Sequence, residues 1–204
     1  MSHRGTAMIN HNVQFPEPSG KRCLMMPFIQ GDPLSVPEDF RVGYENIIAS
    51  TFIKKGDVGY LTIDEASVKK GMPHRGDRAM HGRALHTEAG VRPNGLYAWG
   101  SGNRVYLDSD VKVLLANNID DSCALWNATH TNTSFDGDIG DLSDDYPYEH
   151  ATLMKAGDVH EIGILTPHES LPVAENGNRQ FLRIISSGVH GREEHFTVNP
   201  LMKH

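Results

Sequence analysis

From residue 83 onward the chain is a succession of short apolar segments, each bounded by Gly, Asn or Asp. These segments are 83–87, 95–99, 104–107, 111–117, 124–129 and 152–154, with longer ones inside 156–185. Short strands at a spacing of about eight to twelve residues are typical of an all-β sandwich or barrel. The sequence therefore predicts a mainly β (α+β) fold, and its 204 residues suffice for one such domain with a real core.

The N-terminal part of the chain precedes this β-rich region and has a different pattern. Residues 1–22 are polar and contain two prolines, so we expect an arm before a first strand at 23–29. Ser35 can cap a helix, and apolar residues recur at helical spacing from Phe40 onward. This pattern predicts a helix that runs to about Lys55.

The remaining segments have weaker signals. A short strand is expected at 58–63, followed by a helical turn at 64–70 and a loop at 71–83 that carries basic side chains and histidines. The acidic stretch Asp136–Asp145 lacks the glycine and glutamate positions of an EF-hand loop and is interpreted as a solvated loop. The end of the chain, 191–204, is predicted to be an edge strand followed by a frayed tail.

Composition excludes several classes of protein. Lys and Arg number 19 against 26 Asp and Glu, a formal charge of -7, which disfavours duplex nucleic acid as a partner. Cys23 and Cys123 are far apart and do not form a metal-type pair, which fits a reducing compartment. No run approaches eighteen apolar residues, and the polar start has no apolar signal region. We expect a cytoplasmic protein with no membrane partner, and its oligomeric state stays open.

The stretch 156–185 organises the functional interpretation. It is predicted to form two strands joined by a polar turn, with His168 placed between them after a proline. Arg179, Phe181 and Arg183 occupy alternate positions of the second strand and therefore share one face. That face is cationic around an aromatic ring, whereas the opposite face is mainly apolar.

These residues carry a resemblance to a known family. The run His-Glu-Ser-Leu-Pro-Val from His168, followed by Gly-Asn-Arg-Gln-Phe-Leu-Arg-Ile, resembles the C-terminal half of the double-stranded β-helix in iron(II)- and 2-oxoglutarate-dependent dioxygenases. The prolyl-hydroxylase-like branch is the most similar. The resemblance implies a jelly-roll or cupin-like domain over 1–204, with one or two N-terminal helices packed outside. It also implies that His168 is an iron ligand and that Arg179 pairs with the far carboxylate of 2-oxoglutarate, with Arg183 as the alternative.

An iron site of this kind needs a second histidine and a carboxylate. His86 and Glu88 form the only His-x-acid pair in the appropriate part of the chain, and as neighbours at i and i+2 of a strand they project to one side. The family more often has aspartate where this chain has Glu88. His130 and His160 are alternatives to His86, while His74, His81 and His150 are interpreted as surface or core residues.

The resemblance implies a non-haem oxygenase that uses Fe(II) and 2-oxoglutarate to hydroxylate a small-molecule or peptide substrate. Tyr97 and Asn117 correspond to positions that line the cosubstrate pocket, although core packing explains the aromatic residue equally well. Two other functions remain open at this point. One is a non-catalytic β-sandwich used for binding or assembly. The other is a cupin-type metalloenzyme that does not use 2-oxoglutarate.

Overall fold

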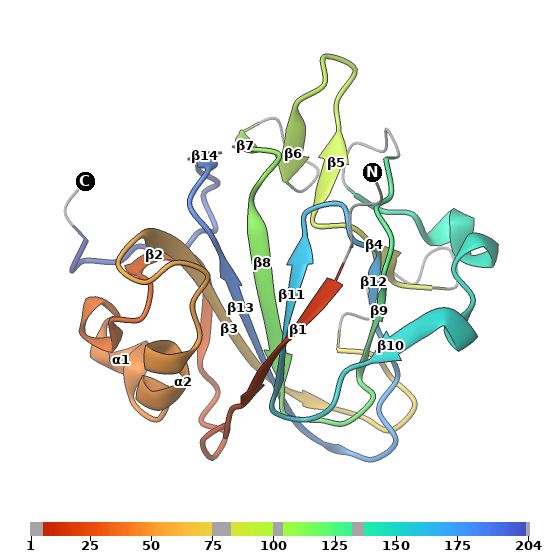
Figure 1. The fold of residues 1–204 in the computed structure, drawn as a ribbon. Coiled ribbons are helices and arrows are strands. Elements are labelled where there is room, and N and C mark those ends of the chain that lie inside the picture. Colours follow the sequence, from red (N-terminus) through yellow and green to blue (C-terminus); the bar gives the residue numbers. More distant parts are fainter. Residues whose placement is uncertain (1–5, 75–82, 100–103, 132–136, 203–204) are drawn as a thin grey trace.

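The computed structural model describes residues 6–74, 83–99, 104–131 and 137–202, and these residues form three antiparallel sheets (Figure 1). A six-stranded sheet has the order β1-β11-β8-β13-β3-β2, and two four-stranded sheets have the orders β10-β9-β12-β4 and β14-β7-β6-β5. The large sheet contains β1 (Thr6–Asn12), β2 (Arg22–Ile29), β3 (Val58–Val68), β8 (Lys112–Asn117), β11 (Asp158–Gly163) and β13 (Gly177–Ile185). The second sheet contains β4 (Leu85–His86), β9 (Cys123–Trp126), β10 (Ala151–Leu153) and β12 (His168–Ser170), and the third contains β5 (Ala89–Val91), β6 (Tyr97–Trp99), β7 (Val105–Leu107) and β14 (Val189–Gly191). The predicted mainly β class is confirmed.

Strand β13 is central in the large sheet, where it pairs with β3 along its whole length and with β8 on its other side. Leu182 and Ile184 pack into a core cluster on the helix-covered face, whereas Arg179 and Phe181 line a cavity on the opposite face. The predicted alternation along this strand is therefore confirmed.

The predicted hairpin within 156–185 is wrong. Strand β8 lies between β11 and β13, so the two predicted partners do not pair with each other. The connection between them carries β12, which belongs to the second sheet and contains His168. His168 therefore lies in a strand of its own.

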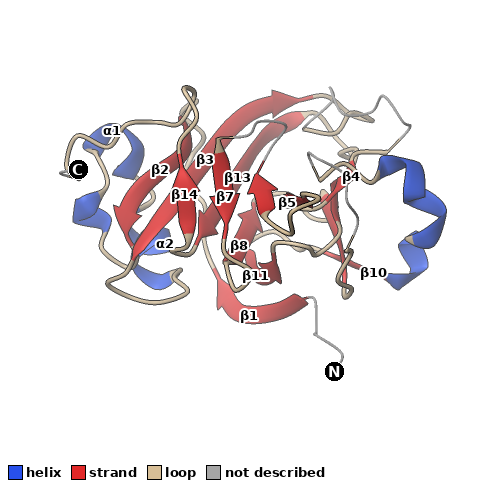
Figure 2. Cartoon of the chain, turned by 90° about the horizontal axis from the view of Figure 1, so that it is seen from above, coloured by secondary structure: helices blue, strands red, loops and turns tan. Residues whose placement is uncertain are grey.

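Short helices cover the outer face of the large sheet (Figures 1 and 2). They are the 3-10 helix η1 (Pro33–Ser35) and the α-helices α1 (Glu38–Arg41) and α2 (Glu45–Ser50). Tyr44, Ile47 and Ile48 are fully or almost fully buried against this face, which confirms helices packed outside the sheets.

The single helix predicted from Ser35 to Lys55 is wrong. The chain leaves the helical conformation at Gly43, whose φ of 88° is a conformation that suits glycine. Ser35 does not cap a following helix either, since its hydroxyl donates to the carbonyl of Asp32 at 2.7 Å within the preceding turn. The apolar spacing was correct, but it is met by two short helices rather than one.

Other local predictions also need correction. Residues 64–68 continue β3 because they pair with the first half of β13, so the predicted helical turn at 64–70 is wrong. Residues 6–12 of the predicted arm form β1, paired with β11. The predicted frayed tail is docked: the Asn199 side chain donates to the carbonyls of Pro27 and Ser35, both at 2.7 Å.

The acidic stretch contains the 3-10 helix η3 (Gly140–Asp145), which is followed by η4 (Tyr148–His150). Asp136 and most of the predicted loop at 71–83, including His81, lie outside the described residues. Both Cys23 and Cys123 are buried. Among the described helices, none combines the length and apolar character needed to span a membrane.

Candidate metal and anion site

The two predicted histidine ligands meet between adjacent strands of the second sheet. His86 ends β4, His168 begins β12, and the antiparallel register places these two residues directly opposite each other. Their ring centroids are 4.1 Å apart, and both residues are buried, at 7% and 5% exposure. Two segments that are distant in the sequence thus place their imidazoles side by side.

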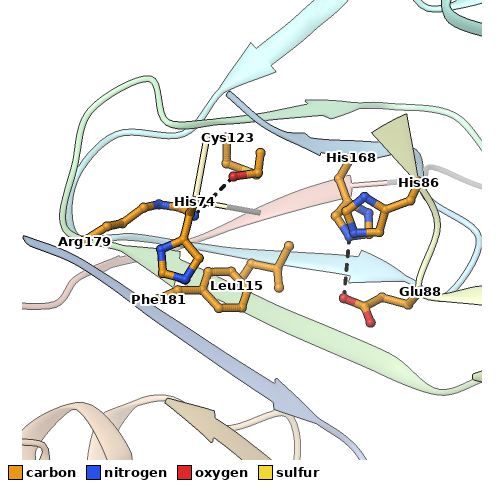
Figure 3. A pocket seen from close by; sticks show the side chains of 9 residues that line it. His74, His86, Glu88, Leu115, Cys123, His168, Arg179 and Phe181 are labelled. Carbon is orange, nitrogen blue, oxygen red and sulfur yellow. Dashed lines mark hydrogen bonds and ion pairs between the residues drawn. The ribbon is translucent and has the colours of Figure 1, made fainter. Parts of the chain in front are cut away.

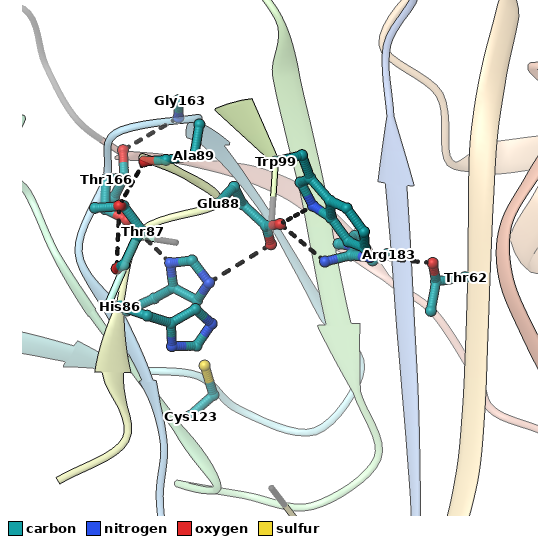
Figure 4. Close-up of polar contacts among 12 residues, drawn as sticks. Thr62, His86, Thr87, Glu88, Ala89, Trp99, Cys123, Gly163, Thr166 and Arg183 are labelled. Carbon is teal, nitrogen blue, oxygen red and sulfur yellow. Dashed lines mark hydrogen bonds and ion pairs between the residues drawn. The ribbon is translucent and has the colours of Figure 1, made fainter. Parts of the chain in front are cut away.

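Both imidazole rings are held in the same way, each by a backbone carbonyl, and Figure 4 shows the His86 ring beside the contacts of Glu88 with Trp99 and Arg183. His86 Nδ1 lies 2.8 Å from the carbonyl oxygen of Ala84, and His168 Nδ1 lies 2.9 Å from that of Thr166. A carbonyl oxygen only accepts, so each Nδ1 carries a proton, and Nε2 is the nitrogen through which the neutral ring could bind a metal ion. Metal-binding histidines are commonly oriented by such a hydrogen bond from the other ring nitrogen.

Glu88 completes the group from the segment between β4 and β5. Its Oε1 lies 3.5 Å from His168 Nε2, while its Oε2 accepts hydrogen bonds from Arg183 Nη1 at 2.8 Å and Trp99 Nε1 at 3.3 Å. Burial by itself raises the pKa of Glu88, but the Arg183 guanidinium and the two nearby imidazoles hold this pKa well below its usual range. The carboxylate is therefore ionised.

The three side chains supply two imidazole nitrogens and one carboxylate, the donor set of the facial triad that holds non-haem Fe(II). Two donors each about 2.1 Å from one ion lie roughly 3.0 Å apart at a right angle and roughly 3.4 Å apart at a tetrahedral angle. The 3.5 Å separation of His168 Nε2 and Glu88 Oε1 is close to this range. Among the described residues, however, no group of three or more His, Cys, Asp or Glu side chains is arranged so that it could hold a metal ion. Binding of a metal ion would therefore require these side chains to rearrange.

A small cavity adjoins these residues (Figure 3). The lining side chains come from strands β4, β8, β9, β12 and β13, the segment after β3 and the segment after β4: His74, His86, Glu88, Leu115, Cys123, His168, Ser170, Arg179 and Phe181. Its volume is about 30 Å³, enough for about one water molecule, so a larger ligand requires lining side chains to move. In Figure 3, Leu115 and Phe181 lie between the His86–Glu88–His168 group and Arg179.

Arg179 lies on the opposite side of this cavity and is only 3% exposed. Its Nη1 donates to Ser170 Oγ at 3.3 Å and its Nη2 to the carbonyl of Ser122 at 3.4 Å, while its Nε has no hydrogen-bond partner in the part of the chain that the structure describes. Burial lowers the pKa of Arg179. The described residues offer this guanidinium no carboxylate within ion-pair distance, although a buried cation is normally paired with an anion. The site thus has an unmatched positive charge facing a cavity.

The other predicted cosubstrate residues lie elsewhere. Arg183, the alternative to Arg179, bonds Glu88 and also donates to Thr62 Oγ1 at 3.4 Å. Tyr97 is half-buried and packs against an interior apolar cluster. Asn117 is fully buried, and its Oδ1 accepts from the Ser122 hydroxyl at 2.8 Å. Among the described cavity-lining residues, neither Tyr97 nor Asn117 occurs.

The alternative histidines do not join the group. His130 Nδ1 lies 2.6 Å from the Tyr146 hydroxyl. His160 is buried in β11 opposite Leu115, outside the cavity lining, and His150 is exposed. His74 was interpreted as a surface or core residue, but it lines the cavity. No sequence signal marks its loop position as functional.

Three comparisons with known proteins complete the description. Neither a protein-family model nor a curated protein matches this chain. Solved structures do match: EvdO2 from Micromonospora carbonacea var. aurantiaca, complexed with 2-oxoglutarate, is 11% identical with a TM-score of 0.45, over 98% of this chain and 93% of that one. CytC3 with Fe(II) and alpha-ketoglutarate is 16% identical with a TM-score of 0.35, over 66% of this chain and 49% of that one.

Other alignments are more partial. The non-haem monooxygenase ThoJ in its apo form is 11% identical with a TM-score of 0.34, over 68% of this chain and 56% of that one. EvdMO1 is 14% identical with a TM-score of 0.38, and this chain spans 27% of its length. These identities and TM-scores are low, so the functional case rests on the side chains of this chain.

Proposed function

We propose that this chain is a non-haem oxygenase dependent on Fe(II) and 2-oxoglutarate, built on a double-stranded β-helix. His86, Glu88 and His168 would hold the iron, and Arg179 would bind the far carboxylate of 2-oxoglutarate. The observation that supports this proposal most strongly is the shared cavity: a buried guanidinium, which has no carboxylate partner among the described residues, faces two imidazoles and a carboxylate across it.

The residues fit these two ligands in their chemistry. The donor set is that of a facial triad, and both imidazoles keep Nε2 for a metal ion because their Nδ1 atoms bond backbone carbonyls. A planar guanidinium suits a carboxylate because it can donate two parallel hydrogen bonds. When bound, Fe(II) and 2-oxoglutarate would supply the chemistry by which O2 gives one oxygen atom to succinate, with release of CO2, and the other to the hydroxylated product.

The chain itself contributes position and environment. Arg183 and Trp99 both donate to Glu88 Oε2, which leaves Oε1 directed toward His168. Leu115 and Phe181 form an apolar part of the cavity wall, which limits water near the reacting groups. The protein would thereby fix the ligands before any reaction occurs. The substrate is proposed to be a small molecule or a peptide.

The direct test measures metal binding and turnover on the same samples. Calorimetry with Mn(II) should show one site in the native chain, and Fe(II) with ascorbate and 2-oxoglutarate should yield succinate. Both signals should disappear in His168→Ala and persist in His150→Ala, a control at an exposed histidine. Equal metal binding and equal succinate yield in the native chain and His168→Ala would refute the proposal.

A second variant distinguishes the proposed oxygenase from the cupin-type alternative. Arg179→Ala should weaken 2-oxoglutarate binding while Mn(II) binding persists, since Arg179 lies across the cavity from the proposed ligands. Metal binding together with an activity that needs no 2-oxoglutarate and survives in Arg179→Ala would favour the cupin-type enzyme instead.

A further inference from the structure

His74 belongs to the segment that follows β3, and its side chain is 6% exposed. Its Nε2 lies 3.1 Å from Oδ2 of Asp64, a residue of β3. Asp64 is opposite Phe181 in the pairing of β3 with β13, and both Phe181 and His74 line the cavity. The ion pair with Asp64 thus holds the His74 ring at the cavity wall near Arg179 (Figure 3).

The other ring nitrogen of His74 is the notable atom. Nδ1 is buried and has no hydrogen-bond partner among the described residues, and the same is true of Arg179 Nε. Buried polar atoms are normally satisfied, so an unpartnered one in a native structure calls for an explanation. Here two of them belong to side chains that line one cavity, which indicates a ligand able to accept hydrogen bonds from both.

The protonation chemistry of His74 favours an anion. The Asp64 carboxylate can only accept, so His74 Nε2 carries a proton. In the imidazolium form Nδ1 carries a second proton and becomes a donor. Asp64 offsets the positive charge of this form and is itself 3.4 Å from Arg22 Nε. A carboxylate in the cavity would then accept one hydrogen bond from His74 and others from Arg179.

We propose that His74 is a second anion-binding residue and that it clamps the far carboxylate of 2-oxoglutarate together with Arg179. Asp64 is the positioning residue that orients the His74 ring. This inference rests on the proposed function and adds to it the basis of cosubstrate selection. A 2-oxo acid is selected when it carries a second carboxylate that reaches both side chains.

The test compares 2-oxoglutarate with 2-oxobutyrate, which lacks the far carboxylate. His74→Ala should raise the KM for 2-oxoglutarate about 10- to 100-fold, the effect of one lost hydrogen bond to a charged group, with a smaller change in kcat. The KM for 2-oxobutyrate should stay unchanged in the same variant. Asp64→Asn should raise the KM for 2-oxoglutarate in the same direction but less.

Binding supplies a readout that does not depend on turnover. Calorimetric titration of 2-oxoglutarate into the Mn(II)-loaded protein should show the same loss of affinity in His74→Ala, while the Mn(II) affinity itself is unchanged. His190→Gln is the matched control, because His190 forms a similar pair with Asp108 at 2.9 Å but is 62% exposed. Its affinity for 2-oxoglutarate should equal that of the native chain.

The possible outcomes separate this inference from the function on which it rests. If the native chain binds neither Mn(II) nor 2-oxoglutarate, the proposed function fails. If the native chain and His74→Ala bind 2-oxoglutarate equally while Arg179→Ala binds it weakly, the function stands and the role of His74 is refuted. Circular dichroism verifies folding, and His74→Gln, which keeps a polar side chain, replaces the alanine variant if that variant does not fold. Equal affinities of His74→Gln and the native chain for both acids would also refute the inference.

Discussion

Replacement of Arg183 by methionine tests the ion pair that fixes Glu88. The two side chains are almost fully buried, at 2% and 4% exposure, and Arg183 Nη1 is 2.8 Å from Glu88 Oε2. Arg183→Met keeps a long apolar side chain but leaves the carboxylate without its guanidinium. Removal of one partner of a buried ion pair costs about 3–5 kcal/mol. Because Trp99 and His168 still contact the carboxylate, we expect the lower end, about 3 kcal/mol.

The assay is urea denaturation followed by circular dichroism, with EDTA present so that no metal contributes. At about 2–4 °C per kcal/mol for a domain of this size, Arg183→Met should also lower Tm by roughly 6–12 °C. Arg104→Met is the matched control, since Arg104 pairs with Glu194 at 3.5 Å while 65% and 90% exposed. It should change stability by less than about 1 kcal/mol.

A double-mutant cycle isolates the interaction itself. Glu88→Leu leaves the Arg183 guanidinium buried and unpaired, whereas Arg183→Met with Glu88→Leu removes both charges. The double variant should therefore be more stable than the sum of the single effects predicts, by about 2 kcal/mol or more. A cost below about 1 kcal/mol for Arg183→Met, together with a coupling energy near zero, would refute the view that this pair fixes Glu88.

The pH dependence follows from the same contact. The folded pKa of Glu88 is depressed, so its contribution to stability is complete above the unfolded pKa and is lost as the pH falls through the folded pKa. As the pH falls below the unfolded value, the native chain should therefore lose this contribution progressively until the folded pKa is reached. In Arg183→Met the pKa of Glu88 is less depressed, so less stability should be lost over this acid range.

Three further predictions concern the scaffold. Glu65 accepts hydrogen bonds from the Tyr44 hydroxyl at 2.8 Å and from Gln180 Nε2 at 3.0 Å. Burial raises the pKa of Glu65, but its hydrogen bonds lower this pKa overall. Glu65→Leu should therefore lower the free energy of unfolding by about 1–3 kcal/mol at neutral pH, and equal urea midpoints of the variant and the native chain would contradict this. That cost should shrink as the pH falls through the folded pKa of Glu65, because its stabilising contribution is present above the unfolded value. Burial raises the pKa of the Cys23 thiol to about 12, so a thiol reagent should label Cys23 only after denaturation, and labelling of the native chain would disprove its burial. Asn199→Ala removes two hydrogen bonds to backbone carbonyls and should lower stability by about 1–3 kcal/mol, measured by urea denaturation.

The features that the sequence predicted well depend on local periodicity. The alternation in β13 is visible because its nine residues place charged and apolar side chains on opposite faces. The helical spacing around Tyr44 and Ile47 likewise marked the face that packs on the sheet. The interruption at Gly43 could not be located, since an isolated glycine inside an apolar helical pattern can either be tolerated or end the helix.

Which strands pair with each other depends on segments that are distant in the sequence, so no local sequence pattern predicted the pairing. The stretch 156–185 suggested a hairpin, yet β8 lies between its two long strands. Strands β4 and β12 contain two and three residues, too few to show any period. His86 and His168 were therefore brought together by the family resemblance, and only the register of these short strands shows the contact.

The two arginines of β13 show where strand periodicity stops being informative. Arg179 and Arg183 have the same chemistry and share one face, roughly 13 Å apart along the strand. The sequence could not decide which of them binds an external carboxylate, because that depends on what each one meets across the sheets. Arg183 meets Glu88, so its charge is already matched inside the protein. Among the described residues, Arg179 donates to hydroxyl and carbonyl oxygens and lies against the Phe181 ring, with no carboxylate within ion-pair distance, so its charge remains for a ligand. An external anion is therefore expected at Arg179, while Arg183 orients the carboxylate proposed to bind the metal.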